Sequence, residues 1–237
     1  MLEFWHEFLP SQYENYKHFV KDDIGPVYNK CLFDLLSEFN GLSDYDDLVL
    51  KVPEHFPIPT MVSNPITIKF LQFLIRLTKA HQVLEIGTYI GISAIKMAQA
   101  MPSSGYLITI EKGKQFFELA KANIKNNPTE CYISTNYGDA LELVSDWQLN
   151  PFNQEDLIYL DADKPNYDKY LDPLLGILRP GGLLIVDDVL FHGDVLNNAP
   201  VTDHGRGVKK LLEKATALNC PKVLLPLSNG VLLIQAS

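Results

Sequence analysis

The stretch Val83-Leu84-Glu85-Ile86-Gly87-Thr88-Tyr89-Ile90-Gly91 decides the fold of this chain. It begins with a short apolar run, which is typical of a buried strand, and continues into a turn that contains two glycines. Residues 93–100 then have the apolar spacing of a helix. A buried strand, a glycine turn and a helix in this order predict the first unit of a parallel α/β sheet.

The same pattern repeats towards the C terminus. We expect further strands at residues 106–110, 131–135, 157–160 and 183–186, with amphipathic helices between them and a turn at Arg179-Pro180-Gly181-Gly182 before the last of these strands. Two final apolar runs, residues 222–227 and 231–235, flank Ser228-Asn229-Gly230, which is a hairpin signal. The sequence therefore predicts a mostly parallel sheet that ends with an antiparallel pair.

The first 60 residues have a different pattern. Apolar residues at helical spacing between Tyr13 and Phe39 predict two amphipathic helices, and Pro53, Pro57 and Pro59 mark a connector. A third helix is expected to follow an N-cap at Ser63 or Asn64, with an apolar face formed by Ile66, Phe70, Phe73, Leu74 and Leu77. We expect a helical extension at residues 1–60, which would supply lid or dimer contacts, and one domain at residues 61–237.

Composition narrows the range of partners and the cellular location. The 237 residues include 20 basic and 29 acidic side chains, so the net charge is −9 and association with nucleic acid or anionic membrane is disfavoured. No apolar run approaches the ~20 residues of a membrane helix, and the first ten residues show no signal-peptide pattern. The three cysteines lack a CxxC spacing and are typical of reduced thiols. We expect a cytoplasmic protein.

Acidic residues follow almost every expected strand. In an open α/β sheet, ligands bind beyond the carboxyl ends of the strands. Any single carboxylate there can be a helix cap, but a gathered set repels itself and needs a cationic ligand or a metal. The acidic residues at these positions are Glu85, Glu111, Asp139, Asp161, Asp163, Asp187 and Asp188.

Glu111 ends the second strand, about twenty residues after the glycine turn. A carboxylate there can accept hydrogen bonds from the ribose of an adenosine, which fits NAD as well as S-adenosylmethionine. The spacing of Gly87 and Gly91 favours S-adenosylmethionine, because there is no GxGxxG to hold a pyrophosphate. Glu85 also suits a ligand that carries an ammonium and a sulfonium.

Asp161, Asp187 and Asp188 end two strands that are expected to be neighbours. Carboxylate oxygens in this arrangement match a hard cation such as Mg²⁺, Ca²⁺ or Mn²⁺, although the aspartate pair can also cap a turn. Lys164 follows closely; beside a cation its pKa should fall so that it can accept a proton, and a salt bridge to Asp163 is the structural alternative. His192 and His204, in the loop after the fifth strand, are candidates to line a substrate pocket.

Three stretches resemble the cation-dependent O-methyltransferases, the family of the caffeoyl-CoA and catechol O-methyltransferases. They are the run from Val83 to Ser93, Leu160-Asp161-Ala162-Asp163-Lys164-Pro165-Asn166-Tyr167, and the run from Gly181 to Leu190. The similarity covers residues ~60 to 237, including the closing residues 226–231. It implies a Rossmann-like class I methyltransferase fold with a seven-stranded sheet.

The resemblance also implies the site. Metal ligands are expected at Asp161, Asp187 and Asp188, where the family usually has asparagine at the third position, and Lys164 is the expected general base, acting with Asp161 in catalysis. The residues expected to contact S-adenosylmethionine are Ser63, Glu85, Gly87, Thr88, Tyr89, Ser93, Glu111, Asp139, Ala140, Asp161 and Asp163.

These observations predict an S-adenosylmethionine- and divalent-metal-dependent O-methyltransferase that acts on a catechol-like or other small hydroxylated aromatic acceptor. The loop at residues 189–206 holds Arg206 as its only Lys or Arg, which disfavours an acyl-CoA acceptor. The resemblance and the apolar N-terminal helices predict a homodimer. Two alternatives stay open: a tRNA hydroxyuridine O-methyltransferase and an NAD-dependent oxidoreductase.

Overall fold

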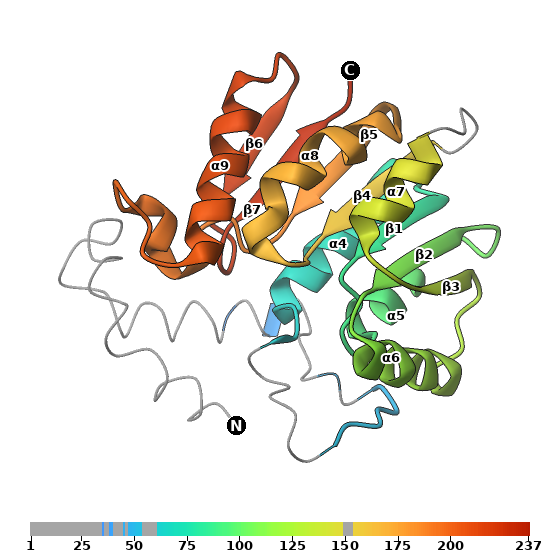
Figure 1. The fold of residues 1–237 in the computed structure, drawn as a ribbon. Coiled ribbons are helices and arrows are strands. Elements are labelled where there is room, and N and C mark those ends of the chain that lie inside the picture. Colours follow the sequence, from blue (N-terminus) through green and yellow to red (C-terminus); the bar gives the residue numbers. More distant parts are fainter. Residues whose placement is uncertain (1–34, 36–37, 40–44, 46, 54–60, 149–153) are drawn as a thin grey trace.

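The structure is a computed structural model that describes residues 35, 38–39, 45, 47–53, 61–148 and 154–237 (Figure 1). The two helices expected between residues 13 and 39 lie, for the most part, outside these residues. The division of the chain at residue 60 therefore stays a prediction.

Seven strands form one sheet in the order β3-β2-β1-β4-β5-β7-β6. Their bounds are β1 Gln82–Ile86, β2 Tyr106–Glu111, β3 Tyr132–Tyr137, β4 Glu155–Leu160, β5 Leu178–Val186, β6 Lys222–Leu225 and β7 Val231–Gln235. Strands β1 to β5 pair in parallel, and β7 is antiparallel to both β5 and β6. The expected mostly parallel sheet with a C-terminal hairpin is confirmed. The order of strands reverses between β1 and β4, which is where such sheets bind ligands.

Helices cover both faces of the sheet (Figure 1). Side chains of α7 (Ala140–Gln148), α8 (Tyr167–Gly176) and α9 (Asp203–Ala217) pack into the core on one face. Those of α4 (Pro65–Thr78), α5 (Ile92–Ala98) and α6 (Lys114–Asn126) pack on the other. Two short 3₁₀ helices, η2 (Lys164–Asn166) and η3 (Phe191–Leu196), follow β4 and β5. No helix in the described residues is long and apolar enough to cross a membrane.

The expected apolar face of α4 is partly wrong. Asn64 is the N-cap, since its side chain accepts a hydrogen bond from the backbone N of Ile66 at 2.9 Å. Phe73 and Leu77, however, are 60% and 65% exposed. The helix instead buries Gln72, whose Nε2 donates to the carbonyl of Lys96 on α5 at 2.7 Å. A polar side chain can be buried when it has such a hydrogen-bond partner. The spacing of apolar residues therefore did not correctly predict which face of α4 is buried.

The expected turn before β5 is also wrong. Strand β5 begins at Leu178 and includes the Arg179-Pro180-Gly181-Gly182 segment. Leu178 pairs with Glu155 of β4, and the register shifts between Glu155 and Leu157. The proline and glycines are therefore accommodated in an irregular part of the ladder rather than outside it.

We predict that the buried carboxyl of Glu155 makes folding depend on pH. This side chain is 5% exposed, and burial, with a smaller effect of Asp156, raises its pKa from 4.5 to about 7. The protonated form therefore contributes stability that is fully present below about pH 4.5 and is lost as pH rises through about 7. Glu155→Gln should raise the free energy of unfolding at pH 8 by something on the order of 1–3 kcal/mol and have little effect at pH 4.

Urea unfolding at both pH values tests this. Glu118→Gln, on the exposed surface of α6, is the matched control and should change neither value. Equal effects of Glu155→Gln at the two pH values would contradict the prediction.

Candidate active site

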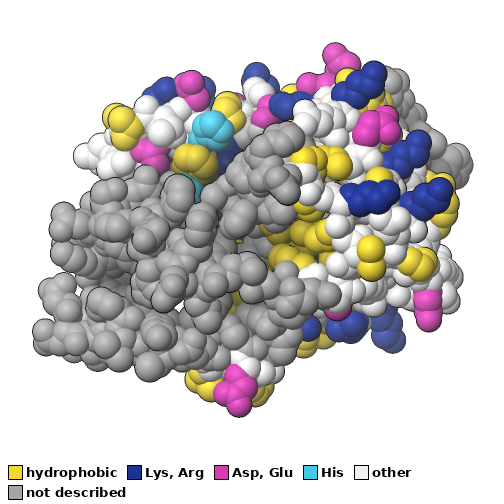
Figure 2. All heavy atoms as spheres, turned by 90° about the horizontal axis from the view of Figure 1, so that it is seen from below, with side chains coloured by type: hydrophobic (Ala, Val, Ile, Leu, Met, Phe, Trp, Pro, Cys, Tyr) yellow, Lys and Arg dark blue, Asp and Glu magenta, His cyan; other side chains and the backbone are white. Residues whose placement is uncertain are grey.

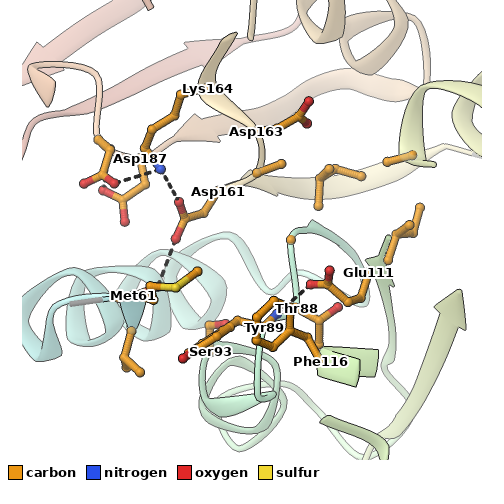
Figure 3. Close-up of a pocket in the computed structure, with 18 of the residues that line it drawn as sticks. Met61, Thr88, Tyr89, Ser93, Glu111, Phe116, Asp161, Asp163, Lys164 and Asp187 are labelled. Carbon is orange, nitrogen blue, oxygen red and sulfur yellow. Dashed lines mark hydrogen bonds and ion pairs between the residues drawn. The ribbon is translucent and has the colours of Figure 1, made fainter. Parts of the chain in front are cut away.

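A cavity of about 700 Å³ lies beyond the carboxyl ends of β1, β2, β4 and β5 (Figure 3). It contains most of the residues that the sequence singled out, and two groups of them are set apart in the close-up: Lys164 with Asp161 and Asp187, and Glu111 with Tyr89 and Phe116. The expected site residues that line it are Ser63, Gly87, Thr88, Tyr89, Ser93, Glu111, Ala140, Asp161, Asp163, Lys164, Asp187 and Asp188.

Glu111 is held by backbone groups at its end of the cavity. Its Oε2 accepts from the N of Tyr89 at 2.9 Å, and its Oε1 accepts from the N of Gly113 at 2.7 Å. Each carboxylate oxygen has a further lone pair, so the pair can still accept hydrogen bonds from a diol. The rings of Tyr89 and Phe116 pack beside it with centroids 4.9 Å apart. A fixed carboxylate next to two aromatic rings is suited to a ribose and its adjoining base.

Two expected cofactor residues do not line the cavity. Asp139 is exposed and its Oδ1 accepts from the N of Leu141 at 2.8 Å, so its side chain caps the start of α7. Glu85 is fully buried and accepts from the hydroxyl of Thr109 at 2.6 Å. Burial raises the pKa of Glu85 to about 7, and its Oε1 has no hydrogen-bond partner within the described residues. A buried acceptor of this kind is open to a donor from a bound molecule or water.

The opposite end of the cavity is a cluster of charges. Nζ of Lys164 lies 3.1 Å from Oδ1 of Asp161 and 2.9 Å from Oδ2 of Asp188. The salt bridge to Asp163 that was the structural alternative is wrong, because Asp163 pairs instead with Lys112, at 3.1 Å. Lys164 therefore joins the end of β4 to the end of β5.

The pKa values show how crowded these charges are. Burial, together with the charges of Asp161 and Asp188, raises the pKa of Asp187 to about 8. Burial lowers the pKa of Lys164, but electrostatic interactions with Tyr167, Asp161 and Asp188 outweigh this effect and hold that pKa well above the usual value. The expected fall of the pKa of Lys164 concerns the protein with a cation bound and stays a prediction. The ammonium group pairs directly with two of the three carboxyl groups.

These residues fit a divalent cation in their chemistry. Three carboxylates at neighbouring strand ends are the oxygen donors that Mg²⁺ and Ca²⁺ prefer, and their mutual repulsion favours added positive charge. Within the described residues, no group of three or more His, Cys, Asp or Glu side chains is already arranged to hold a metal ion. The ammonium of Lys164 stands between two of the three carboxylates, so a cation bound by all three requires Lys164 to move aside.

Close backbone contacts set the position of this cluster. Gly87, at φ +96°, lies so near the carbonyl oxygen of Asp161 that a Cβ would overlap it. Gly207 of α9 approaches the carbonyl oxygen of Lys164 in the same way. Asp188 has φ +59°, a left-handed conformation that, among residues with a side chain, asparagine and aspartate adopt most readily.

Aromatic side chains of η3 and of the first turn of α9 line the cavity, and His204, expected in the loop after β5, belongs to α9. The rings of Phe191 and His204 stack with centroids 5.1 Å apart and planes 6° apart, and His192 packs against Phe191 at 5.4 Å. His192 and His204 therefore line the cavity, as considered from the sequence. Phe191, Met61 and Lys112 also line it and were missed, because an apolar or basic residue in a loop has no distinguishing pattern.

Comparison with known proteins identifies the family. The model of the O-methyltransferase family matches residues 43–236. The chain belongs to this O-methyltransferase family. A catechol O-methyltransferase of Niastella koreensis is 30% identical over 210 residues, which cover 87% of this chain and 88% of that protein. A caffeoyl-CoA O-methyltransferase of Medicago sativa is 30% identical over 173 residues, covering 69% and 70% of the two chains.

A solved structure agrees with the family. The O-methyltransferase TomG of Streptomyces achromogenes, determined in complex with S-adenosylmethionine, matches with a TM-score of 0.70 and 25% identity, covering 81% of this chain and 94% of that one. The resemblance, the fold class and the enzyme class expected from the sequence, an S-adenosylmethionine-dependent O-methyltransferase, are thereby confirmed.

We predict that Glu111 binds the ribose of the methyl donor. Glu111→Ala removes two charge-assisted acceptors, and S-adenosylmethionine should bind more weakly by about 1.5–3 kcal/mol, or roughly 10- to 150-fold. Isothermal titration calorimetry measures this directly. Glu118→Ala, an exposed carboxylate of the neighbouring helix α6, is the control. An unchanged dissociation constant in Glu111→Ala would place the ribose elsewhere.

Proposed function

We propose that this O-methyltransferase uses a divalent cation, with Mg²⁺ the best suited, to move a methyl group from S-adenosylmethionine to a hydroxyl of a catechol-like or other small hydroxylated aromatic acceptor. One observation carries the proposal. The cavity combines a lysine among three aspartates near one end with a backbone-anchored glutamate near the other.

The residues divide into two groups. Asp161, Asp187 and Asp188 would hold the cation. The methyl donor would contact Ser63, Gly87, Thr88, Tyr89, Ser93, Glu111, Ala140, Asp161 and Asp163. When bound, the donor supplies an electrophilic methyl group, and the cation supplies positive charge that lowers the pKa of an acceptor hydroxyl and weakens the hold of the carboxylates on the Lys164 proton.

Lys164 would move the proton. A phenol with a pKa of ~10 is a poor nucleophile at neutral pH, so the reaction needs its proton removed as the oxygen attacks. Nζ of Lys164 faces the cavity beside Asp161 and Asp188. The acceptor oxygen would take the methyl group as the methyl–sulfur bond of the donor breaks, and Lys164 would take the phenol proton and pass it to water. The side chains around both partners hold them in line, which is a large part of the rate enhancement.

The charges around the cavity favour a small acceptor without phosphates. Lys112 and Lys164 are the only lysine or arginine residues among the described lining residues, and each contacts a carboxylate. Arg206 donates to the carbonyls of Pro200 and Val201 and pairs with Asp203. These cations are therefore engaged within the protein rather than available to a coenzyme A chain. The relative named as a catechol O-methyltransferase also supports a catechol-like acceptor.

The two alternatives have less support. In the coloured part of Figure 2, acidic side chains occur among the basic ones, whereas tRNA binding favours a continuous basic surface. The matched family and relatives are O-methyltransferases, which leaves an NAD-dependent oxidoreductase without support. The net charge of −9 further disfavours binding to nucleic acid. We also propose a cytoplasmic location.

A screen of acceptors tests the proposed function. With S-adenosylmethionine and Mg²⁺, catechols should be methylated faster than caffeoyl-CoA and tRNA, because the lining cations are already paired. The rate of S-adenosylhomocysteine production is the measurement. The Lys164→Met variant, which has nearly the same side-chain length and lacks the amine, should be at least about 100-fold slower. Preferred methylation of tRNA or caffeoyl-CoA would contradict the acceptor class.

Asp188 provides a test of the cation site. Asparagine shares the left-handed preference of aspartate, so Asp188→Asn changes the charge and keeps the backbone. We expect the affinity for Mg²⁺ to fall at least about tenfold. At saturating Mg²⁺ the turnover should be kept or raised, with the pH–rate curve shifted to lower pH, because a less neutralised cation lowers the pKa of the bound phenol further.

Titration of Mg²⁺ into chelator-treated wild type and Asp188→Asn measures both effects. Asp161→Ala should abolish the metal-dependent activity in the same assay. Identical metal dependence in the wild type and Asp188→Asn would exclude Asp188 as a ligand whose charge matters, and full activity in chelator would exclude the cation.

We also propose a homodimer. Light scattering should give about twice the chain mass of 26.7 kDa. A mass of one chain at high concentration would contradict it.

A further inference from the structure

Tyr159 is a buried tyrosine directly behind the charge cluster. It lies in β4 between aliphatic residues, and its side chain is fully buried and is not among the residues that line the cavity. Its hydroxyl donates to Oδ2 of Asp187 at 2.6 Å and lies 3.1 Å from Oγ of Ser63. A buried hydroxyl is costly unless its hydrogen bonds are made, and here both neighbours belong to the site.

The hydrogen bond from Tyr159 means that both carboxylate oxygens of Asp187 accept a hydrogen bond from the protein. The other oxygen of Asp187, Oδ1, accepts from the backbone N of Asp188 at 2.9 Å. Each oxygen of Asp187 thus has a donor from the protein, while the residue still lines the cavity. Each oxygen keeps a lone pair for a ligand. The orientation of this carboxylate is therefore set by β4 as well as by its own strand, β5.

The same hydroxyl links Asp187 to the rest of the site. Oγ of Ser63, just before α4, contacts Tyr159 and lies 3.4 Å from Oδ2 of Asp161. A chain of polar contacts therefore runs from Asp187 through Tyr159 and Ser63 to Asp161. It joins the ends of β4 and β5 from the side opposite Lys164, which links Asp161 to Asp188.

Tyr159 acts in this chain as a donor. The hydrogen bond runs from this hydroxyl to Oδ2 of Asp187, a carboxylate oxygen that accepts it. A neutral donor orients a carboxylate without cancelling its charge.

We propose that Tyr159 is a positioning residue that holds the Asp187 carboxylate in the orientation required for binding the divalent cation. The inference rests on the proposed function, because it assumes that Asp187 is a cation ligand. Groups that orient a ligand from behind typically change metal affinity 10- to 100-fold when they are removed. The expected role differs from that of Lys164, which touches the carboxylates from within the cavity.

The test is the affinity of the Tyr159→Phe variant for Mn²⁺ alone, measured by calorimetry on the full chain without methyl donor or acceptor. Phenylalanine keeps the ring and its packing and removes only the donor. We expect Mn²⁺ to bind about 10- to 100-fold more weakly than to the wild type. The matched control is Tyr132→Phe in β3, which also removes a tyrosine hydroxyl, here from an exposed side chain that does not line the cavity. It should change the Mn²⁺ affinity less than twofold.

A second measurement separates positioning from damage to the fold. The affinity for S-adenosylhomocysteine in the absence of a cation should differ less than threefold between Tyr159→Phe and the wild type. An unchanged Mn²⁺ affinity in Tyr159→Phe would overturn the inference and leave the proposed function intact. An equal loss of Mn²⁺ and S-adenosylhomocysteine affinity would also overturn it, since that marks a structural role. A wild type that binds no Mn²⁺ would overturn the cation part of the proposed function and the inference with it.

Discussion

The ion pairs of Lys164 with Asp161 and Asp188 are the interaction around which the active site is organised. Parallel pairing of β4 with β5 brings the carboxyl ends of both strands to one edge of the sheet, and therefore brings three aspartates together. Such a cluster is unfavourable in a buried place unless positive charge is present. The ammonium group compensates part of the charge, and burial, together with the remaining negative charge of Asp161 and Asp188, raises the pKa of Asp187. The proposed cation and the proposed base both follow from this imbalance.

The geometry of the cluster also depends on close backbone contacts. Gly87 allows the end of β1 to approach the carbonyl of Asp161, and Gly207 allows α9 to approach that of Lys164. Behind the carboxylates, Tyr159 provides a hydroxyl where a strand side chain would otherwise be aliphatic. The charged groups are thus held by packed elements on several sides. This rigidity suits a methyl transfer, in which the approach of oxygen to carbon must be in line.

Much of this arrangement could be predicted because its signals are local. The glycine turn after β1, the acidic residues at strand ends and the Ser228-Asn229-Gly230 hairpin are read from neighbouring residues. Features that depend on contacts between distant parts of the chain were harder to predict from the sequence. The partner of Lys164 and the capping role of Asp139 follow from where neighbouring loops lie. Tyr159 carried no signal beyond being the one hydroxyl in an apolar run, because only the pairing of β4 with β5 brings it to Asp187.

The left-handed backbone at Asp188 has a consequence for how this site can evolve. Most side chains are strained in that conformation, so the position is in effect open to aspartate, asparagine and glycine. Aspartate and asparagine codons differ by a single base. One point mutation can therefore add or remove a negative charge beside Lys164 while leaving the main chain where it is. The charge of this centre is a trait that selection can adjust in one step, independently of the fold.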